Sequence, residues 1–411
     1  MANIRPFAAY RPAPGMESKI AALPYDVYNR EEACAVVAEN PESFLAIDRA
    51  ETGFGPEVDT YAPEVYARAA SMIQERIADG RFIKEDIPCY YLYELTMDGR
   101  SQTGIVACAS IDDYANNIIK KHENTRADKE QDRINHVDIC NMQTGPIFLA
   151  YRMDEVLKDI TRAVKDNAPV YDFVSEDGIG HRVWVISDSV SVTGIKARFE
   201  QMNAVYIADG HHRCASAVKV GLKRRAENPG YTGEEEFNYF LSVLFPDDEL
   251  HIMDYNRVVK DLNGYSVEEF LMKISESFEV EKASVSPYRP MEKGSFGMYL
   301  EGQWYCLTAR EEILSEDAVK GLDVSLMQDY LLAPILGIDD PKTDKRIDFV
   351  GGIRGLKELE RRVETDMKVA FSMYPTSIGE LFAVADAGML MPPKSTWFEP
   401  KLRSGLFLHE L

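Results

Sequence analysis

The sequence has few cysteines and no long apolar run, and each shortage excludes a class of protein. Its 411 residues contain six scattered cysteines and no CxxC pair. We therefore expect reduced thiols rather than a disulfide framework or a cysteine metal site. No run of about 18 apolar residues is present, which excludes a membrane-spanning helix. The opening letters MANIRPFAAYRPAPG lack the apolar core of a secretory signal, so we expect a cytoplasmic protein.

Basic residues are also scarce. Lys and Arg number 46 against 68 Asp and Glu, a formal charge of −22. A surface this negative repels polyphosphate backbones, so we expect no nucleic-acid partner. Hydrophobic residues at 45% and charged residues at 28% are typical of a soluble globular chain. A chain of this length forms one large or two intimate α/β units, and copies of it can also associate.

Strand and helix patterns alternate along the chain. Apolar spacing predicts helices over 60–80 and 153–168, and alternating runs predict hairpins over 89–111 and 170–188. From about residue 240, further strands alternate with helices. The mixture predicts an α/β or α+β fold rather than a bundle or a sandwich. We place a domain boundary at 245, with a core over 1–245 and an α+β lobe with a terminal strap over 246–411.

The segment YIADGHHRCASAV, residues 206–218, is a short apolar strand, a tight turn and the start of a helix. A helix N-terminus presents unpaired N–H groups and a partial positive charge. Gly210 allows a ligand to approach the backbone, Arg213 offers a planar fork of donors, and His211 and His212 can donate further hydrogen bonds. Together they predict a cradle for nucleotide phosphates.

Two other interpretations of this segment stay open. Asp209 could cap the helix while Arg213 pairs with a surface acid, which would make the motif purely structural. His211 and His212 could instead bind a metal, although adjacent helical residues point about 100° apart. No nearby Cys or His completes such a ligand set.

A second stretch, IIKKHENTRADKEQDRINHVD over 118–138, carries the densest basic cluster of this acidic chain. One interpretation is a solvated helix with charge pairs at i,i+4 spacing. The functional interpretation is a pocket for an anionic ligand, in which Glu123 stays ionised among cations. There Glu123 could accept a proton from a substrate hydroxyl. His122 and Glu123 are no zinc-protease signature, because Arg126 stands where the second histidine would be.

The turn ADGHHR resembles the phosphate-binding segment of the ParB/sulfiredoxin superfamily, and most of all that of its free serine kinases, which also carry an upstream His-Glu pair. More of the chain matches one bacterial family. From its motifs LPYDVYN, KKHENT, DR, GPIF, ADGHHR and MPPKSTWFEPKLRSGLF, the protein is identified as a member of the family called domain of unknown function 1015. The resemblance implies a ParB/sulfiredoxin-like nucleotide-binding core with a large insertion between Glu123 and Asp209, and an additional C-terminal α+β lobe.

The resemblance to the kinases also implies an activity: phosphoryl transfer from ATP or ADP, with Mg²⁺, to the hydroxyl of free serine. By that likeness Glu123 is the catalytic base, Asp209 holds the substrate or assists Mg²⁺, and residues 210–213 bind phosphates. The remaining candidates for binding the substrate are Tyr25 and Asp26 for its amino group, Lys121, Arg126 and Lys129 for its carboxylate, and His122 and Lys394. A nucleotide-binding regulator and an enzyme acting on another phosphorylated or hydroxylated compound stay open as alternatives.

Overall fold

The computed structural model describes residues 1–411, apart from the side chain of Asp128, and divides into two compact units. The first unit comprises Met1–Leu250 and Pro400–Leu411, and the second comprises His251–Glu399. The predicted mixed α/β fold with an additional C-terminal α+β lobe is confirmed. None of the helices described is long and apolar enough to cross a bilayer. All six cysteines are unpaired, as their spacing predicted.

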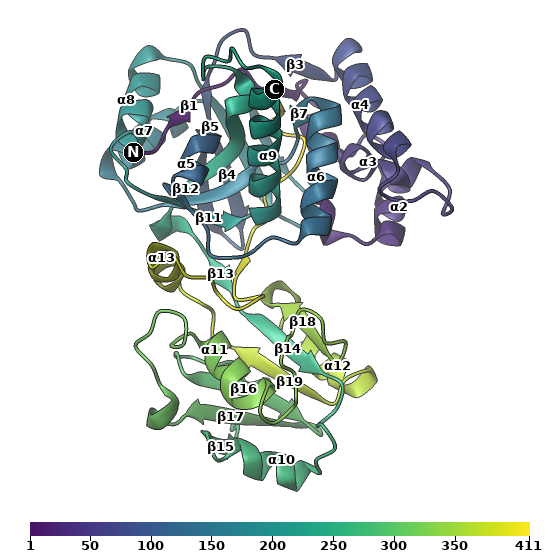
Figure 1. Ribbon diagram of the computed structural model, residues 1–411, viewed down its shortest axis with the longest axis vertical. Coiled ribbons are helices and arrows are strands. Elements are labelled where there is room, and N and C mark those ends of the chain that lie inside the picture. Colours follow the sequence, from purple (N-terminus) through teal and green to yellow (C-terminus); the bar gives the residue numbers. More distant parts are fainter. The chain divides into compact units, whose positions relative to one another are not determined.

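A nine-stranded mixed sheet forms the centre of the first unit (Figure 1). Its path runs β6-β11-β8-β12-β5-β4-β10-β9, with β1 paired to β5. Two neighbouring pairs, β6 with β11 and β8 with β12, are parallel, and the other pairs are antiparallel. The strands are β1 Ile4–Arg5, β4 Tyr90–Met97, β5 Arg100–Ser110, β6 Ile119–Lys120, β8 Ile147–Tyr151, β9 Tyr171–Val174, β10 Gly180–Ile186, β11 Val205–Asp209 and β12 Tyr239–Pro246.

The helices of this unit pack apolar faces against the sheet and against one another. They are α1 Glu17–Ile20, α2 Arg30–Glu39, α3 Leu45–Asp48, α4 Pro63–Ala78, α5 Ile111–Ala115, α6 Ala127–Cys140, α7 Glu155–Lys165, α8 Ser189–Phe199 and α9 His211–Glu227. A core of Ile, Leu, Val and aromatic side chains from the sheet, α7, α8 and α9 is almost fully buried. Figure 1 shows α6 and α9 side by side, and the two helices are in contact.

Short strand pairs attach the chain's last residues to the first unit. β21 (His409–Glu410) pairs with β7 (Met142–Gln143). Leu408 forms a bridge with Tyr10 of β2 (Tyr10–Pro12), the strand that pairs with β3 (Phe82–Lys84). Backbone hydrogen bonds join Ser404 to Ala22 in both directions, at 2.8 and 3.1 Å. Residues 400–411, called the strap below, therefore lie against the segment that leads into the 3₁₀ turn η1 (Tyr25–Val27).

The second unit contains a six-stranded antiparallel sheet of order β15-β17-β16-β19-β14-β18. Its strands are β14 Tyr255–Val259, β15 Phe278–Lys282, β16 Ser295–Leu300, β17 Gln303–Ala309, β18 Ile347–Gly351 and β19 Val369–Met373, and β13 Ile252–Met253 pairs separately with β20 Trp397–Phe398. The helices are α10 Val267–Ile274, α11 Asp323–Met327, α12 Leu356–Thr365 and α13 Ile378–Asp386. A core cluster that includes Trp304 lies between this sheet and α12.

Candidate functional site

The predicted phosphate turn lies between the end of β11 and the start of α9. Gly210 has φ of 91°, a left-handed conformation that other residues adopt only with strain. A Cβ at this position would lie 3.1 Å from both Nε and Nη2 of Arg213, so any larger residue would crowd the guanidinium. The sequence thus places glycine where both the backbone and the arginine require it.

Asp209 and Arg213 do not make the contacts of the purely structural interpretation. The N-cap of α9 is Gly210, and no side chain caps the helix. Arg213 forms no ion pair with any described residue; its Nη1 donates to the carbonyl of Pro146 at 2.5 Å. That carbonyl belongs to the GPIF motif at the start of β8, the strand next to β11. The remaining guanidinium donors of Arg213 are left for a ligand at the N-terminus of α9.

One pocket of about 320 Å³ opens at this turn, and most of the predicted site residues line it. Its walls are Tyr25, Asp26, Glu123, Asp209, Gly210, His211, His212 and Arg213. Three separate segments, η1, the loop before α6 and the β11–α9 turn, contribute these residues. The structure therefore brings the predicted base to the predicted phosphate cradle.

Both histidines of the turn hold the loop that carries Glu123. His212 Nε2 accepts the backbone N–H of Arg126 at 2.9 Å, and His211 Nε2 accepts that of His122 at a longer 3.5 Å. A neutral ring that accepts at Nε2 carries its proton on Nδ1. Each histidine therefore offers one N–H, not two, to a ligand or neighbour. The paired histidines of ADGHHR thus have a positioning role that the sequence did not reveal.

Burial keeps the inner histidines neutral. It lowers the pKa of His122 to about 4, and burial together with His122 lowers the pKa of His211 well below its usual value. Their rings meet edge to face, with centroids 4.5 Å apart. The Nδ1 of His122 is buried and has no hydrogen-bond partner among the described residues. His122 therefore supports the pocket from behind instead of lining it.

Asp209 has a partner that the sequence analysis missed. Lys401 of the strap donates to Asp209 Oδ2 at 3.0 Å, and the backbone N–H of Gly210 donates to Oδ1 at 2.8 Å. Burial acts to raise the pKa of Asp209, but Lys401 and Arg213 outweigh it and hold that pKa well below its usual range. Lys401 lies in the C-terminal motif EPKL, which is the one sequence signal that points to it.

The other predicted cations are distributed more widely. Lys121 and Arg126 are exposed and are not among the residues that line the pocket. Lys129 lines a neighbouring hollow and donates to the Tyr61 hydroxyl at 3.2 Å. Lys394 belongs to the second unit, where its ammonium lies 5.5 Å from the centroid of the Tyr255 ring.

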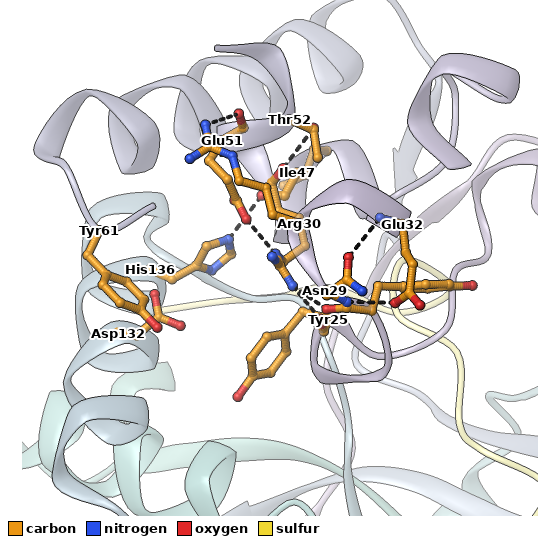
Figure 2. A network of polar contacts seen from close by, with 12 residues as sticks. Tyr25, Asn29, Arg30, Glu32, Ile47, Glu51, Thr52, Tyr61, Asp132 and His136 are labelled. Carbon is orange, nitrogen blue, oxygen red and sulfur yellow. Dashed lines mark hydrogen bonds and ion pairs between the residues drawn. The ribbon is translucent and has the colours of Figure 1, made fainter. Parts of the chain in front are cut away.

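A network behind the pocket fixes the segment that carries Tyr25 (Figure 2). Arg49 donates to the carbonyls of Tyr25 and Tyr28, at 3.1 and 2.6 Å, and pairs with Glu51. A capping box of Asn29 and Glu32 then starts α2. Tyr25 is thereby held with its ring under the guanidinium of Arg133, 3.9 Å from the ring centroid. Burial raises the pKa of Tyr25 to about 12, so the phenol stays protonated.

The described residues hold no group of three or more His, Cys, Asp and Glu side chains that could bind a metal by themselves. In the alternative of a metal bound by His211 and His212, Nε2 of neither ring would be available as a ligand, because each accepts a backbone N–H. The pocket's carboxylates fit a Mg²⁺ ion that arrives with phosphates, since Mg²⁺ commonly takes one or two protein carboxylates and otherwise phosphate oxygens and water. The N-terminus of α9 fits the phosphates themselves.

Comparison with known proteins gives one family and several remote structural likenesses. The model of a family described as protein of unknown function (DUF1015) matches residues 4–325. No curated protein matches the sequence. Among solved structures, a mutant free serine kinase with ADP is 13% identical, with a TM-score of 0.36, covering 72% of this chain and 87% of its own. A free serine kinase with AMP is 14% identical, at TM-score 0.36 and coverages of 72% and 86%. A conserved hypothetical protein from Pyrococcus furiosus is 14% identical, with a TM-score of 0.35, and the match covers 73% of this chain and 93% of that protein.

Proposed function

The chain belongs to the DUF1015 family, as its motifs predicted, and we propose that it is a nucleotide-dependent kinase of a small hydroxyl compound. One observation carries the proposal: Glu123 lines the same pocket as the phosphate-cradle residues Gly210 and Arg213. A base and an anion site in one pocket are what phosphoryl transfer to an alcohol requires. The acceptor is free serine, which the resemblance of ADGHHR and its upstream His-Glu pair to the free serine kinases supports.

The donor nucleotide, ATP or ADP, places its phosphates at the N-terminus of α9. Backbone N–H groups and the unpaired donors of Arg213 bind the oxygens and neutralise charge on the transferred group. Asp209 would hold Mg²⁺ together with the nucleotide's phosphates, and the ion would supply neutralisation of their negative charge. Lys401 keeps Asp209 ionised throughout.

The chemical step is a displacement at the terminal phosphorus. Glu123 accepts the proton of the serine hydroxyl as the hydroxyl oxygen forms its bond to phosphorus. The bond from that phosphorus to the bridging oxygen breaks, and its electron pair leaves on the shortened nucleotide. The products are O-phosphoserine, the nucleotide with one phosphate fewer, and a proton that Glu123 releases to solvent.

Replacement of the base tests the proposal directly. Glu123→Gln removes the proton acceptor but keeps the size of the side chain, so O-phosphoserine formation should fall by about 10²- to 10⁴-fold. The thermal shift produced by ATP or ADP should stay. Glu155→Gln, an exposed substitution on α7, is the matched control and should leave both unchanged.

Arg213→Ala should reduce nucleotide binding itself, because it removes the only guanidinium that lines the pocket in the described structure. Turnover of the Glu123→Gln variant at the wild-type rate would show that the base is another residue. Nucleotide hydrolysis that does not respond to serine or to any hydroxyl compound would favour the regulator instead of the kinase.

A further inference from the structure

Next to the site pocket lies further space that the proposed kinase chemistry does not yet use. Two hollows, of about 470 and 440 Å³, share Tyr25, Asp48, Arg133 and His136 as walls. We call these two hollows the inner chamber. The larger one also shares Tyr25 and Arg213 with the site pocket. The inner chamber therefore adjoins the place where the phosphates are expected to bind.

Arg133 brings a positive charge with spare donors into the inner chamber. It is 7% exposed, and its Nε and Nη2 both contact Asp132 Oδ2, at 3.0 and 2.9 Å. Asp132 is fully engaged, because its other oxygen accepts the hydroxyl of Tyr66 at 3.0 Å. The Nη1 of Arg133 has no acceptor among the described residues. A guanidinium presents five N–H donors, so it keeps part of its fork for a ligand.

Asp48 brings a negative charge that forms no ion pair with a described Lys or Arg, although the nearby charge of Arg133 attracts it. It is 5% exposed, and its Oδ1 accepts the Thr144 hydroxyl at 2.9 Å. The charged group nearest to it in sequence, Arg49, is directed to Glu51. Among the described residues Oδ2 has no donor at all. A buried carboxylate in this state is costly unless a positive group reaches it.

His136 does not supply that positive charge. Its Nε2 lies 4.0 Å from Asp48 Oδ1 and 3.3 Å from the carbonyl of Ile47. Burial, with the nearby charge of Arg133, lowers the pKa of His136 to about 4, so the ring is neutral at neutral pH. In Figure 2, Asp132 and His136 project from α6 beside the segment that carries Tyr25. The chamber thus has one positive donor, Arg133 Nη1, and one negative acceptor, Asp48 Oδ2, to which no described side chain is hydrogen-bonded.

This pair of positions matches a zwitterion. A carboxylate satisfies the guanidinium fork of Arg133, and an ammonium satisfies the second oxygen of Asp48. A nucleobase carries no formal charge to match either group, whereas an amino acid offers a carboxylate to Arg133 Nη1 and an ammonium to Asp48 Oδ2. Tyr25, whose hydroxyl has no hydrogen-bond partner among the described residues, lines both the inner chamber and the pocket of Glu123.

We propose that the inner chamber seats the α-amino and α-carboxylate groups of a free amino acid, with the carboxylate on Arg133 and the ammonium on Asp48. This assignment rests on the proposed kinase function, and it makes the acceptor a free amino acid whose side-chain hydroxyl reaches past Tyr25 to Glu123. It also replaces the exposed Lys121 and Arg126 as partners of the substrate carboxylate.

Binding measurements test the proposal without turnover. We would titrate L-serine, ethanolamine and hydroxypropionate into the full chain saturated with AMP, by calorimetry. Ethanolamine lacks the carboxylate and hydroxypropionate lacks the ammonium. Asp48→Asn keeps the volume of the side chain. It should weaken the binding of serine and of ethanolamine by about 10- to 100-fold and leave the binding of hydroxypropionate unchanged. Arg133→Lys should weaken the binding of serine and of hydroxypropionate and leave the binding of ethanolamine unchanged.

Asp159→Asn, on the exposed surface of α7, is the control and should change none of the three affinities. Nucleotide affinity should be the same in all variants. Serine affinity unchanged by Asp48→Asn would overturn the proposal, as would absence of serine binding to the wild type. A loss of AMP affinity in place of serine affinity would assign the chamber to the nucleotide and overturn it too.

Asp26 is the competing candidate for binding the amino group. It lines the site pocket but neither hollow of the inner chamber, so Asp26→Asn tests the two locations separately. If Asp26→Asn, and not Asp48→Asn, removes the preference for serine over hydroxypropionate, the chamber is the wrong location. A wild type that binds serine with the expected pattern but forms no phosphoserine would support the chamber while refuting the kinase. The two failures are therefore distinguishable.

Discussion

Acidification from pH 7 to pH 4 is expected to destabilise the first unit, because that unit buries histidines in the neutral form. Burial lowers the pKa of His136 to about 4 and that of His181 to about 3, against about 6.5 in an unfolded chain. As the pH falls below 6.5, these histidines bind protons in the unfolded chain but stay neutral in the folded chain. The stability that these residues contribute is complete above pH 6.5 and is lost as the pH falls toward their folded pKa values.

The size of the effect follows from the width of that window. Each such histidine changes the free energy of unfolding by about 1.4 kcal/mol per pH unit, and His136 by about 3 kcal/mol over the whole window. Domains are stable by about 5–15 kcal/mol in total, so two such residues are decisive. His136→Gln removes one of the titrating groups. Its free energy of unfolding should therefore fall less steeply, by about 1.4 kcal/mol per pH unit between pH 4.5 and 6.

The first unit has to be observed separately from the second in this assay. Trp184 is the one tryptophan of the first unit; it is buried, and its Nε1 donates to the carbonyl of Asn167 at 2.9 Å. Substitution of Trp304 and Trp397 by phenylalanine leaves Trp184 as the only indole signal. Urea unfolding at several pH values then gives the slope for each protein. Parallel slopes for the wild type and His136→Gln would refute the reasoning, whatever the absolute stabilities.

Two further predictions concern the site. His212→Ala removes the acceptor for the backbone N–H of Arg126 and should lower kcat about tenfold with little change in nucleotide affinity. Amide hydrogen exchange over 122–126 should become faster in this variant. An unchanged exchange rate would contradict the positioning role of His212. Lys401→Met removes the cation that helps hold the pKa of Asp209 down, so Asp209 takes up a proton at higher pH. The acid limb of the pH–rate profile should move to higher pH, and an unmoved limb would show that Asp209 does not need to be ionised.

Local sequence was sufficient to predict the conformation of the turn between β11 and α9. A glycine between an apolar strand and an amphipathic helix has few structural uses, and β11, Gly210 and α9 occur where the pattern placed them. Arg213 follows by one helical turn, so its side chain reaches back over the glycine. The residues that matter there are neighbours in the chain, and helix geometry alone sets their spacing.

Partners distant in sequence were beyond such reasoning. Lys401 and Asp209 lie 192 residues apart, and nothing in the local pattern of either joins them. Arg133 lies in the basic stretch 118–138, whose polar sequence left open both a solvated helix and a pocket for an anionic ligand. The structure buries Arg133, whose guanidinium packs on the ring of Tyr25. A polar helix gives no apolar stripe, so its sequence does not reveal which face is inside.

The strap explains why so distant a residue belongs to the site. The chain leaves the first unit after Leu250 and re-enters it at Pro400. The re-entering segment pairs with Ala22, just before Tyr25, and its Lys401 binds Asp209 beside the phosphate turn. One short segment thereby holds two walls of the pocket that come from opposite ends of the first unit's sequence. The position of η1 relative to α9 depends on the strap. A substitution in the strap that leaves the chain folded should therefore lower kcat by a larger factor than its effect on the free energy of unfolding would suggest.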